Sequence, residues 1–398
     1  MICEKMVGLV KGSSMIRAMF EEGQNMAKIY GAENVYDFSL GNPNVAPPEA
    51  VKDAVMDLIQ NEDPLRLHGY MSNTGFESTR EAVAKSLNKR YNTSYGANNI
   101  IMTVGAASGL NVAFRSLLNP GDEVIVFAPY FAEYKNYVAN YDGVLVEISP
   151  NTVNFQPKLD EFATKITPKT KCVLVNSPNN PTGVVYSEET YKQMAVILEE
   201  KQKEFGTDIY LITDEPYREL VYGDIKVPYV PDFYRNTIVG YSFSKSLSLP
   251  GERIGYLVIP SEVADYGDVY AAMGVANRIL GYVNAPSLFQ LVVERCLEET
   301  TDISYYDRNR NTLYEGLTKL GFECVFPDGA FYLFVKSPIE DEKVFSEMAK
   351  KYHILIVPGS GFGCPGYVRI AYCVAYETIV NSLPHFKELA DEVFQNGI

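Results

Sequence analysis

The sequence predicts an α/β fold, with a large domain built on a mostly parallel sheet and a smaller α+β domain. Three observations support this prediction. The 398 residues are 46% hydrophobic and 12% aromatic, which is enough for a full core. Between about residues 98 and 260, short β-branched runs alternate with helical stretches, a pattern typical of a sheet with helices on both faces. Beyond about residue 290, a long helical region is followed by short strands.

The first part of the chain is predicted to be helical and then extended. Apolar residues between Met15 and Phe20 recur at helical spacing, so we expect a helix over most of the first thirty residues. Residues 35–40 are expected to be extended, and the glycine and prolines of residues 41–48 predict a turn-rich link. A second helix follows, with its apolar face over residues 51–59.

Six apolar runs predict the strands of the sheet. The last run follows its neighbour too closely for a helical crossover to be certain, so an antiparallel member is possible. Ligands of such sheets bind beyond the carboxyl ends of the strands, which is where we expect the site. The runs are residues 99–104, 123–127, 171–175, 208–213, 237–241 and 254–259.

The C-terminal part is predicted to form the smaller domain together with the N-terminal segment. Its closing helix is expected to start at Ser382-Leu-Pro, because proline is tolerated in the first turn of a helix. The expected divisions are an N-terminal segment (1–45), a large domain (46–288) and a small domain (289–398). The other expected elements are a helix over 307–320 and strands at 322–326, 330–335, 354–357 and 367–371.

Composition excludes several classes of function. The formal charge of −15 and the lack of a basic run argue against a nucleic-acid surface. Six cysteines without CxxC spacing indicate a reducing compartment, and three scattered histidines give no metal-ligand pattern. The N-terminus fits neither a secretory signal nor a membrane span. We therefore expect a cytoplasmic protein that binds small molecules.

Two strand ends carry a lysine and a carboxylate. Lys245 follows one run among small hydroxyl residues, and Arg253 is a neighbouring cation that would depress the pKa of its amine. Asp214 follows another run, where a buried carboxylate needs a cationic partner. Taken singly, a solvated lysine and a helix-capping aspartate are the simpler interpretations.

Two further strand ends supply contacts for a phosphate and a ring. Gly105-Ala-Ala-Ser-Gly leads from a strand into a helix, so its backbone N–H groups can face a phosphate, although such turns are common. In Asn176-Ser-Pro-Asn-Asn-Pro-Thr-Gly, two prolines fix a turn that aims Asn180. Together the four strand ends offer the groups needed to hold pyridoxal 5′-phosphate.

The chain resembles the fold type I, class I/II aminotransferases over nearly its full length. The resemblance implies a large domain with a mostly parallel seven-stranded sheet flanked by helices, and a homodimer with shared active sites. It is carried by GNPN (41–44), the spacing of Tyr70 and Gly75, the loop at Gly105, PYFAEY (129–134), NNPTG (179–183), DEPY (214–217), SFSK (242–245) with Arg253, PDGAFY (327–332), and PGSGFG with YVRI (358–370).

By that resemblance, each residue of the site has an expected role. Lys245 forms a Schiff base with pyridoxal 5′-phosphate and then acts as the base, with Asp214 facing the ring nitrogen. The remaining cofactor contacts are Asn180 and Tyr217 on the ring oxygen, Phe131 stacked on the ring, Ala106, Ala107, Ser242 and Arg253 on the phosphate, and Tyr70 on the phosphate of the neighbouring subunit.

The resemblance also names residues for the substrate, which are Gly41, Asn180, Arg369 and Arg278. Arg369 would grip the α-carboxylate through a planar two-point contact. Arg278 would bind a distal carboxylate in the partner's site, but it lies one position from the simplest register with Asn284-Ala-Pro286. We expect transfer of an amino group from an L-amino acid, with aspartate the leading donor, to a 2-oxo acid such as 2-oxoglutarate.

Two alternatives remain at this point. The same scaffold supports a C–S β-lyase acting on cystathionine or cysteine conjugates. A regulator that senses the cofactor is disfavoured, because no basic helix-turn-helix precedes residue 40.

Overall fold

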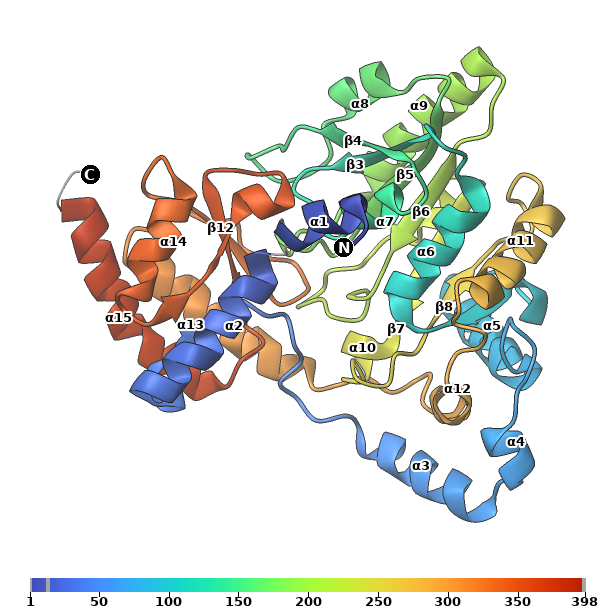
Figure 1. Ribbon diagram of the computed structural model, residues 1–398, viewed down its shortest axis with the longest axis horizontal. Helices are drawn as coiled ribbons and strands as arrows, with labels where there is room; N and C mark the ends of the chain where they lie inside the picture. The colour runs from blue at the N-terminus through green and yellow to red at the C-terminus, as the bar shows by residue number, and fades with distance from the viewer. Residues whose placement is uncertain (1, 12–14, 396–398) are drawn as a thin grey trace.

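A seven-stranded sheet with helices on both faces forms most of the computed structural model, which describes residues 2–11 and 15–395 (Figure 1). The strand order is β2-β8-β7-β6-β5-β3-β4, and only β8 runs against its neighbours. The mostly parallel sheet is therefore confirmed, and the last of the six runs is the antiparallel member. The strands are β2 (Ile100–Thr103), β3 (Glu123–Phe127), β4 (Val144–Ile148), β5 (Thr170–Asn176), β6 (Tyr210–Asp214), β7 (Thr237–Ser242) and β8 (Gly255–Val258).

Alternate side chains of these strands enter different cores, because successive residues of a strand point to opposite faces. Ile101 packs under α6, α7 and α11, whereas Ile100 and Met102 pack under α3, α4, α5 and α12. Helices α8 and α9 cover β3, β5 and β6 on that second face. The helices are α3 (Glu49–Asn61), α4 (Pro64–His68), α5 (Glu77–Tyr91), α6 (Gly105–Leu117), α7 (Tyr134–Ala139), α8 (Leu159–Lys165), α9 (Glu188–Phe205), α11 (Tyr266–Ile279) and α12 (Ser287–Arg295).

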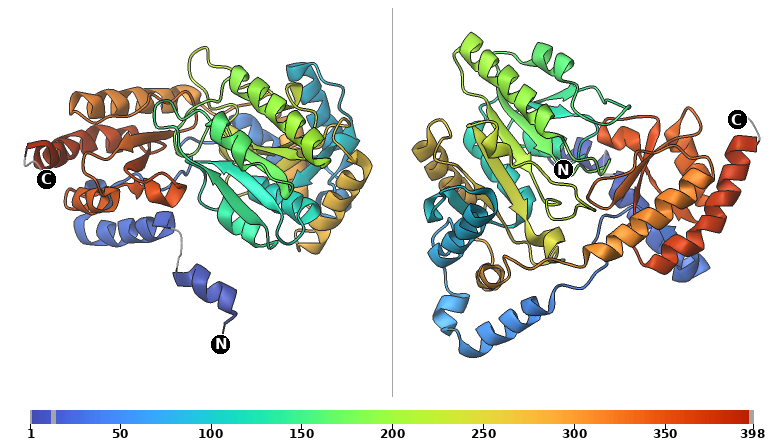
Figure 2. Two further views of the ribbon diagram at one scale, coloured as in Figure 1. Left: turned by 90° about the horizontal axis from the view of Figure 1, so that it is seen from above. Right: turned by 180° about the vertical axis from the view of Figure 1, so that it is seen from behind.

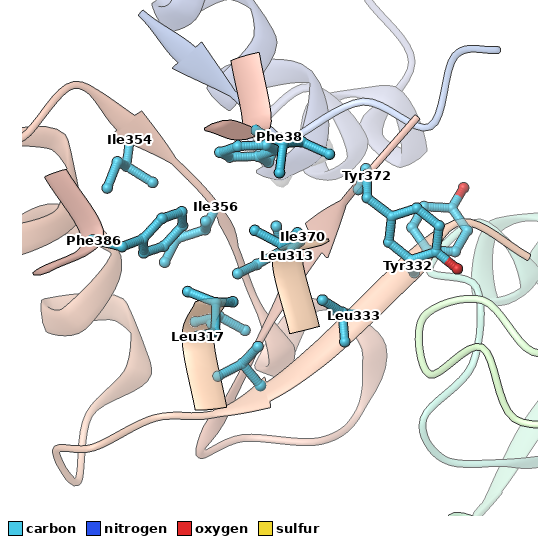
Figure 3. Close-up of a cluster of buried hydrophobic side chains, with 14 of the residues drawn as sticks. Phe38, Leu313, Leu317, Tyr332, Leu333, Ile354, Ile356, Ile370, Tyr372 and Phe386 are labelled. Carbon is cyan, nitrogen blue, oxygen red and sulfur yellow. The ribbon is translucent and has the colours of Figure 1, made fainter. Parts of the chain in front are cut away.

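A smaller body beside the sheet has its own core, which contains Phe38, Leu313, Ile370 and Phe386 (Figure 3). Its three-stranded antiparallel sheet has the order β11-β12-β9, and β1 pairs in parallel with β10, so the N-terminal segment packs here. Helix α1 projects away from the rest of the chain (Figure 2). The elements are α1 (Glu4–Lys11), α2 (Met15–Tyr30), β1 (Tyr36–Asp37), α13 (Ile303–Lys319), β9 (Tyr332–Lys336), α14 (Glu342–Lys350), β10 (Ile354–Leu355), β11 (Val357–Pro358), β12 (Tyr367–Ala371) and α15 (Tyr376–Gln395).

Several element predictions need correction. Helix α2 matches the helix expected from the apolar residues that begin at Met15, whereas α1 was not predicted separately; residues 12–14 lie outside the described residues. Strand β4 was absent from the predicted runs, and the predicted strand at 322–326 is reduced to one bridge between Cys324 and Val335. Helix α15 begins six residues before Ser382 and keeps Pro384 inside it. Its buried face of Ile379, Phe386 and Leu389 outweighs the hydrogen bond that the proline removes.

Within residues 2–11 and 15–395, no helix is both long and apolar enough to cross a membrane. We keep the division at residues 45 and 288 as a proposal. The second boundary falls inside α12 (Ser287–Arg295). This helix packs on α3 and α5 beside the large sheet.

Candidate active site

A cavity of about 360 Å³ lies where the carboxyl ends of the parallel strands meet the smaller body. Eleven of the thirteen predicted site residues line it; Tyr70 and Arg278 do not. The lining consists of Leu40, Gly41, Ala106, Ala107, Leu110, Phe131, Tyr134, Tyr137, Asn176, Asn180, Asp214, Pro216, Tyr217, Ser242, Ser244, Lys245, Pro250, Arg253, Tyr332 and Arg369.

Lys245 is presented to the cavity by the four-residue helix α10 (Phe243–Ser246), which follows β7 directly. The Ser242 side chain caps this helix by accepting from the Ser244 backbone N–H. The Lys245 Nζ donates to the carbonyl oxygen of Gly41 at 2.7 Å. Burial, opposed by Cys373 and assisted by the charges of Arg253 and Arg369, lowers the pKa of the Lys245 amine to about 8. A larger share of this amine is therefore unprotonated at neutral pH than for a solvated lysine.

Asp214 ends β6 with one carboxylate oxygen satisfied and the other not. The Tyr134 hydroxyl donates to its Oδ2 at 2.6 Å, while Oδ1 is buried and has no hydrogen-bond partner within the described part of the chain. Burial raises the pKa of the carboxyl to about 7. A buried carboxylate with a free oxygen facing a cavity fits a ligand that brings a positively charged N–H group.

The phosphate end of the predicted site is built on the start of α6. Ala106 and Ala107 lie in its first turn, where backbone N–H groups have no partner inside the helix. The Arg253 guanidinium lies against Gly105, the first residue of the helix, since a Cβ added to Gly105 would lie 2.6 Å from its Nη2. The Arg253 Nη1 donates to the Ser244 Oγ at 3.3 Å. This combination of a cation, a hydroxyl and a helix N-terminus suits a phosphate group.

Arg369 on β12 reaches across to the large sheet and is buried. Its Nη1 donates to the Asn180 Oδ1 at 3.1 Å, and its Nη2 donates to the Ser39 carbonyl oxygen. The guanidinium lies over the rings of Tyr332 and Phe362, 4.7 and 4.9 Å from their centroids. Burial lowers the pKa of this guanidinium. A buried cation beside a cavity fits an anionic group of a ligand.

Asn180 is fixed by the turn that follows β5. Its backbone N–H donates to the Asn176 Oδ1 at 2.7 Å, and Asn176 also donates to the Asp214 carbonyl oxygen. Phe131 lies on the cavity wall, with its ring edge-on to Tyr134. The predicted turn is thus held to the neighbouring strand by the first asparagine of its own sequence.

Tyr70 and Arg278 lie apart from the cavity lining. Tyr70 is 93% exposed after α4, and Arg278 is exposed near the end of α11. Both were predicted to act on a partner subunit's site, so their distance from the cavity of their own chain does not test these roles.

Two tyrosines of the site were not given roles by sequence reasoning. Tyr134 hydrogen-bonds Asp214, and the Tyr332 hydroxyl lies 2.9 Å from that of Tyr217. Each is the last residue of a motif already noted, PYFAEY and PDGAFY. Those motifs were the available signal, but neither contact can be read from sequence spacing, because the partners are 80 and 115 residues away.

Comparison with known proteins shows the family to which the chain belongs. The pattern of the family described as aminotransferase class I and II matches residues 33–382. A solved amino transferase of Eubacterium rectale is 49% identical with a TM-score of 0.96, covering 99% of each chain. Aspartate aminotransferase of Thermus thermophilus, solved with maleate, is 28% identical with a TM-score of 0.83, covering 94% of this chain and 96% of its own.

A curated relative in Aquifex aeolicus, named as a probable aspartate/prephenate aminotransferase, is 31% identical over 90% of this chain and 92% of its own. The chain belongs to the class I and II aminotransferase family. It is therefore an aminotransferase, and members of this family use pyridoxal phosphate.

Proposed function

We propose that this chain binds pyridoxal 5′-phosphate in the cavity between the seven-stranded sheet and the smaller body. The observation that carries the proposal is the free, buried Oδ1 of Asp214 in the same cavity as an amine of lowered pKa, Lys245. Lys245 would hold the coenzyme by condensing with its aldehyde, with loss of water, and Asp214 would keep the ring nitrogen positively charged. The other contacts are Phe131 against the ring, Asn180 and Tyr217 at the ring oxygen, and Ala106, Ala107, Ser242 and Arg253 at the phosphate.

The bound coenzyme supplies an electron sink for a carbanion at the substrate Cα. The residues of the chain supply the proton transfer and the orientation. Once the substrate amine has displaced it from the coenzyme, the free Lys245 amine would take the proton from the substrate Cα and deliver it to the coenzyme carbon that carried the aldehyde, which suits a pKa lowered to about 8. Arg369 binds the α-carboxylate, and its contact with Asn180 places that carboxylate beside the ring-oxygen residues.

We further propose that the amino donor is aspartate or a similar L-amino acid and that the acceptor is 2-oxoglutarate. The names of the relatives support this choice, and so does the maleate in the Thermus structure, because maleate carries two carboxylates. Arg278 of the partner subunit would bind the distal carboxylate. The C–S lyase alternative is not favoured, since these relatives are aminotransferases.

The active form in this proposal is a homodimer in the cytoplasm. The exposure of Tyr70 and Arg278 leaves both free to reach a second copy of the chain. The cysteines within the described residues are all free, which fits a reducing compartment.

Borohydride trapping and a donor panel test the proposal. Reduction of the coenzyme-bound protein should label Lys245, and Lys245→Ala should lose both label and turnover, whereas Lys336→Ala, an exposed lysine paired with Glu323, should keep both.

With 2-oxoglutarate as acceptor, Arg278→Ala should lower the preference for aspartate over alanine by at least about tenfold, the effect of losing a charged contact. Arg115→Ala, an exposed arginine on α6, is the control. An unchanged preference in Arg278→Ala would remove the distal-carboxylate assignment, and label on another lysine would remove the covalent one.

A further inference from the structure

Tyr332 is a cavity residue with no part in the function proposed so far. It begins β9, is 2% exposed, and its hydroxyl oxygen lies 2.9 Å from that of Tyr217. Gly41 closes the space on another side, because a Cβ added there would lie 2.0 Å from the Tyr332 hydroxyl. Within the described residues, Tyr217 is the hydrogen-bond partner of this hydroxyl.

The number of protons available fixes the direction of this hydrogen bond once the coenzyme is bound. A tyrosine hydroxyl has one proton to donate and can accept in addition. If the Tyr217 proton is donated to the ring oxygen of the coenzyme, it cannot also be donated to Tyr332. At 2.9 Å the second bond then exists only if Tyr332 donates to Tyr217. The two bonds form a chain in which each polarises the other.

The groups around the pair allow both tyrosines to act as donors. Arg369 on β12, Cys373 just after it, and Asp214 at the end of β6 are the titratable groups that face them. Burial raises the pKa of Tyr332 to about 12 and that of Tyr217 well above its usual value. Both hydroxyls therefore keep their protons at neutral pH.

We propose that Tyr332 is a positioning residue that donates to the Tyr217 hydroxyl and thereby directs the Tyr217 proton to the ring oxygen of the coenzyme. This inference rests on the proposed function, since it takes pyridoxal 5′-phosphate and its contact with Tyr217 as given. Tyr332 acts through Tyr217 and does not itself contact the ring oxygen.

The first test compares two ligands of the coenzyme-free protein, pyridoxal 5′-phosphate and its 3-deoxy analogue, which lacks the ring hydroxyl. Tyr332→Phe should weaken binding of pyridoxal 5′-phosphate by about fivefold, the effect of one hydrogen bond, and leave the analogue nearly unchanged. Tyr372→Phe is the matched control. Tyr372 is also buried in a tyrosine pair, 3.2 Å from the Tyr222 hydroxyl, in the same core but outside the cavity lining.

The second test follows the absorbance of the bound coenzyme against pH. A donor to the ring oxygen favours the form in which that oxygen carries full negative charge, which is the form left after proton loss. Tyr332→Phe should therefore raise the pH of the absorbance change by roughly half a unit, whereas Tyr372→Phe should not. In a Tyr217→Phe background, Tyr332→Phe should add no further shift.

The outcomes separate this inference from the proposed function. Equal loss of affinity for both ligands in Tyr332→Phe would reduce its role to packing, and a shift that persists in the Tyr217→Phe background would also overturn the inference. The affinity ratio of the two ligands is measured within each variant, so partial loss of folded protein does not affect it. Failure of the unaltered protein to bind pyridoxal 5′-phosphate at Lys245 would instead overturn the proposed function.

Discussion

At the scale of single residues, Asp214 determines how the site responds to pH. Burial raises its pKa from 3.8 to about 7 in the folded chain, so between these values the folded state holds a proton that the unfolded state has lost. Without coenzyme, the free energy of unfolding should therefore fall as pH rises from about 4 to about 7. The shift corresponds to a loss of a few kcal/mol, on the order of 4.

Asp214→Asn should remove this pH slope. Urea unfolding of the coenzyme-free protein at pH 5 and pH 8 should show a smaller difference in the variant, with the exposed Asp53→Asn as control. The turnover of Asp214→Asn should fall at least about a hundredfold, because the proposed charged partner of the ring nitrogen is gone. Equal pH slopes in the variant and the unaltered protein would show that Asp214 is not the buried acid described here.

At the scale of elements, the turn that carries Asn180 depends on Gly183. This glycine has φ +73°, and a Cβ there would lie 2.4 Å from the Pro327 Cβ and 2.9 Å from the Gly329 carbonyl oxygen. Gly183→Ala should lower the free energy of unfolding by about 2 to 4 kcal/mol and displace Asn180, lowering kcat/KM. Gly206→Ala is the control, because Gly206 has φ +67° with open space around it and should lose only about 1 kcal/mol. Equal melting temperatures for the two variants would contradict the packing argument.

The sequence alone was sufficient to predict the buried strands, but it did not predict the edge strand or the hydrogen bonds between distant residues. Strands β5, β6 and β7 lie inside the sheet, are almost entirely buried and were predicted, whereas β4 lies at the sheet edge with Val144 half-exposed and was missed. The residues at strand ends were found because parallel strands bring those ends together. Tyr134 and Tyr332 were not assigned roles, since their hydrogen bonds depend on tertiary packing.

At the scale of the whole molecule, the proposed shared site can be tested by mixing inactive subunits. Tyr70→Ala and Lys245→Ala should each lower turnover strongly, but a mixed dimer holds one site with both native residues. Equal mixing with subunit exchange should restore about one quarter of the activity of the unaltered protein, because about half of the dimers are mixed and each has one intact site. A mixture no more active than its components would rule out a shared site.

The reversed strand β8 has a consequence for how the anchoring groups arrive. Because β8 runs against β7, its first residue and not its last lies at the cavity rim, so Arg253 reaches that rim just before the strand begins. One short return of the chain, which contains the four-residue helix α10, thus brings Lys245 and Arg253, the proposed covalent anchor and the proposed phosphate-binding cation, to the same rim. Their separation is set by the geometry of that return. An insertion that slid β8 by one position would exchange the side chains that β8 buries in the two cores on opposite faces of the sheet.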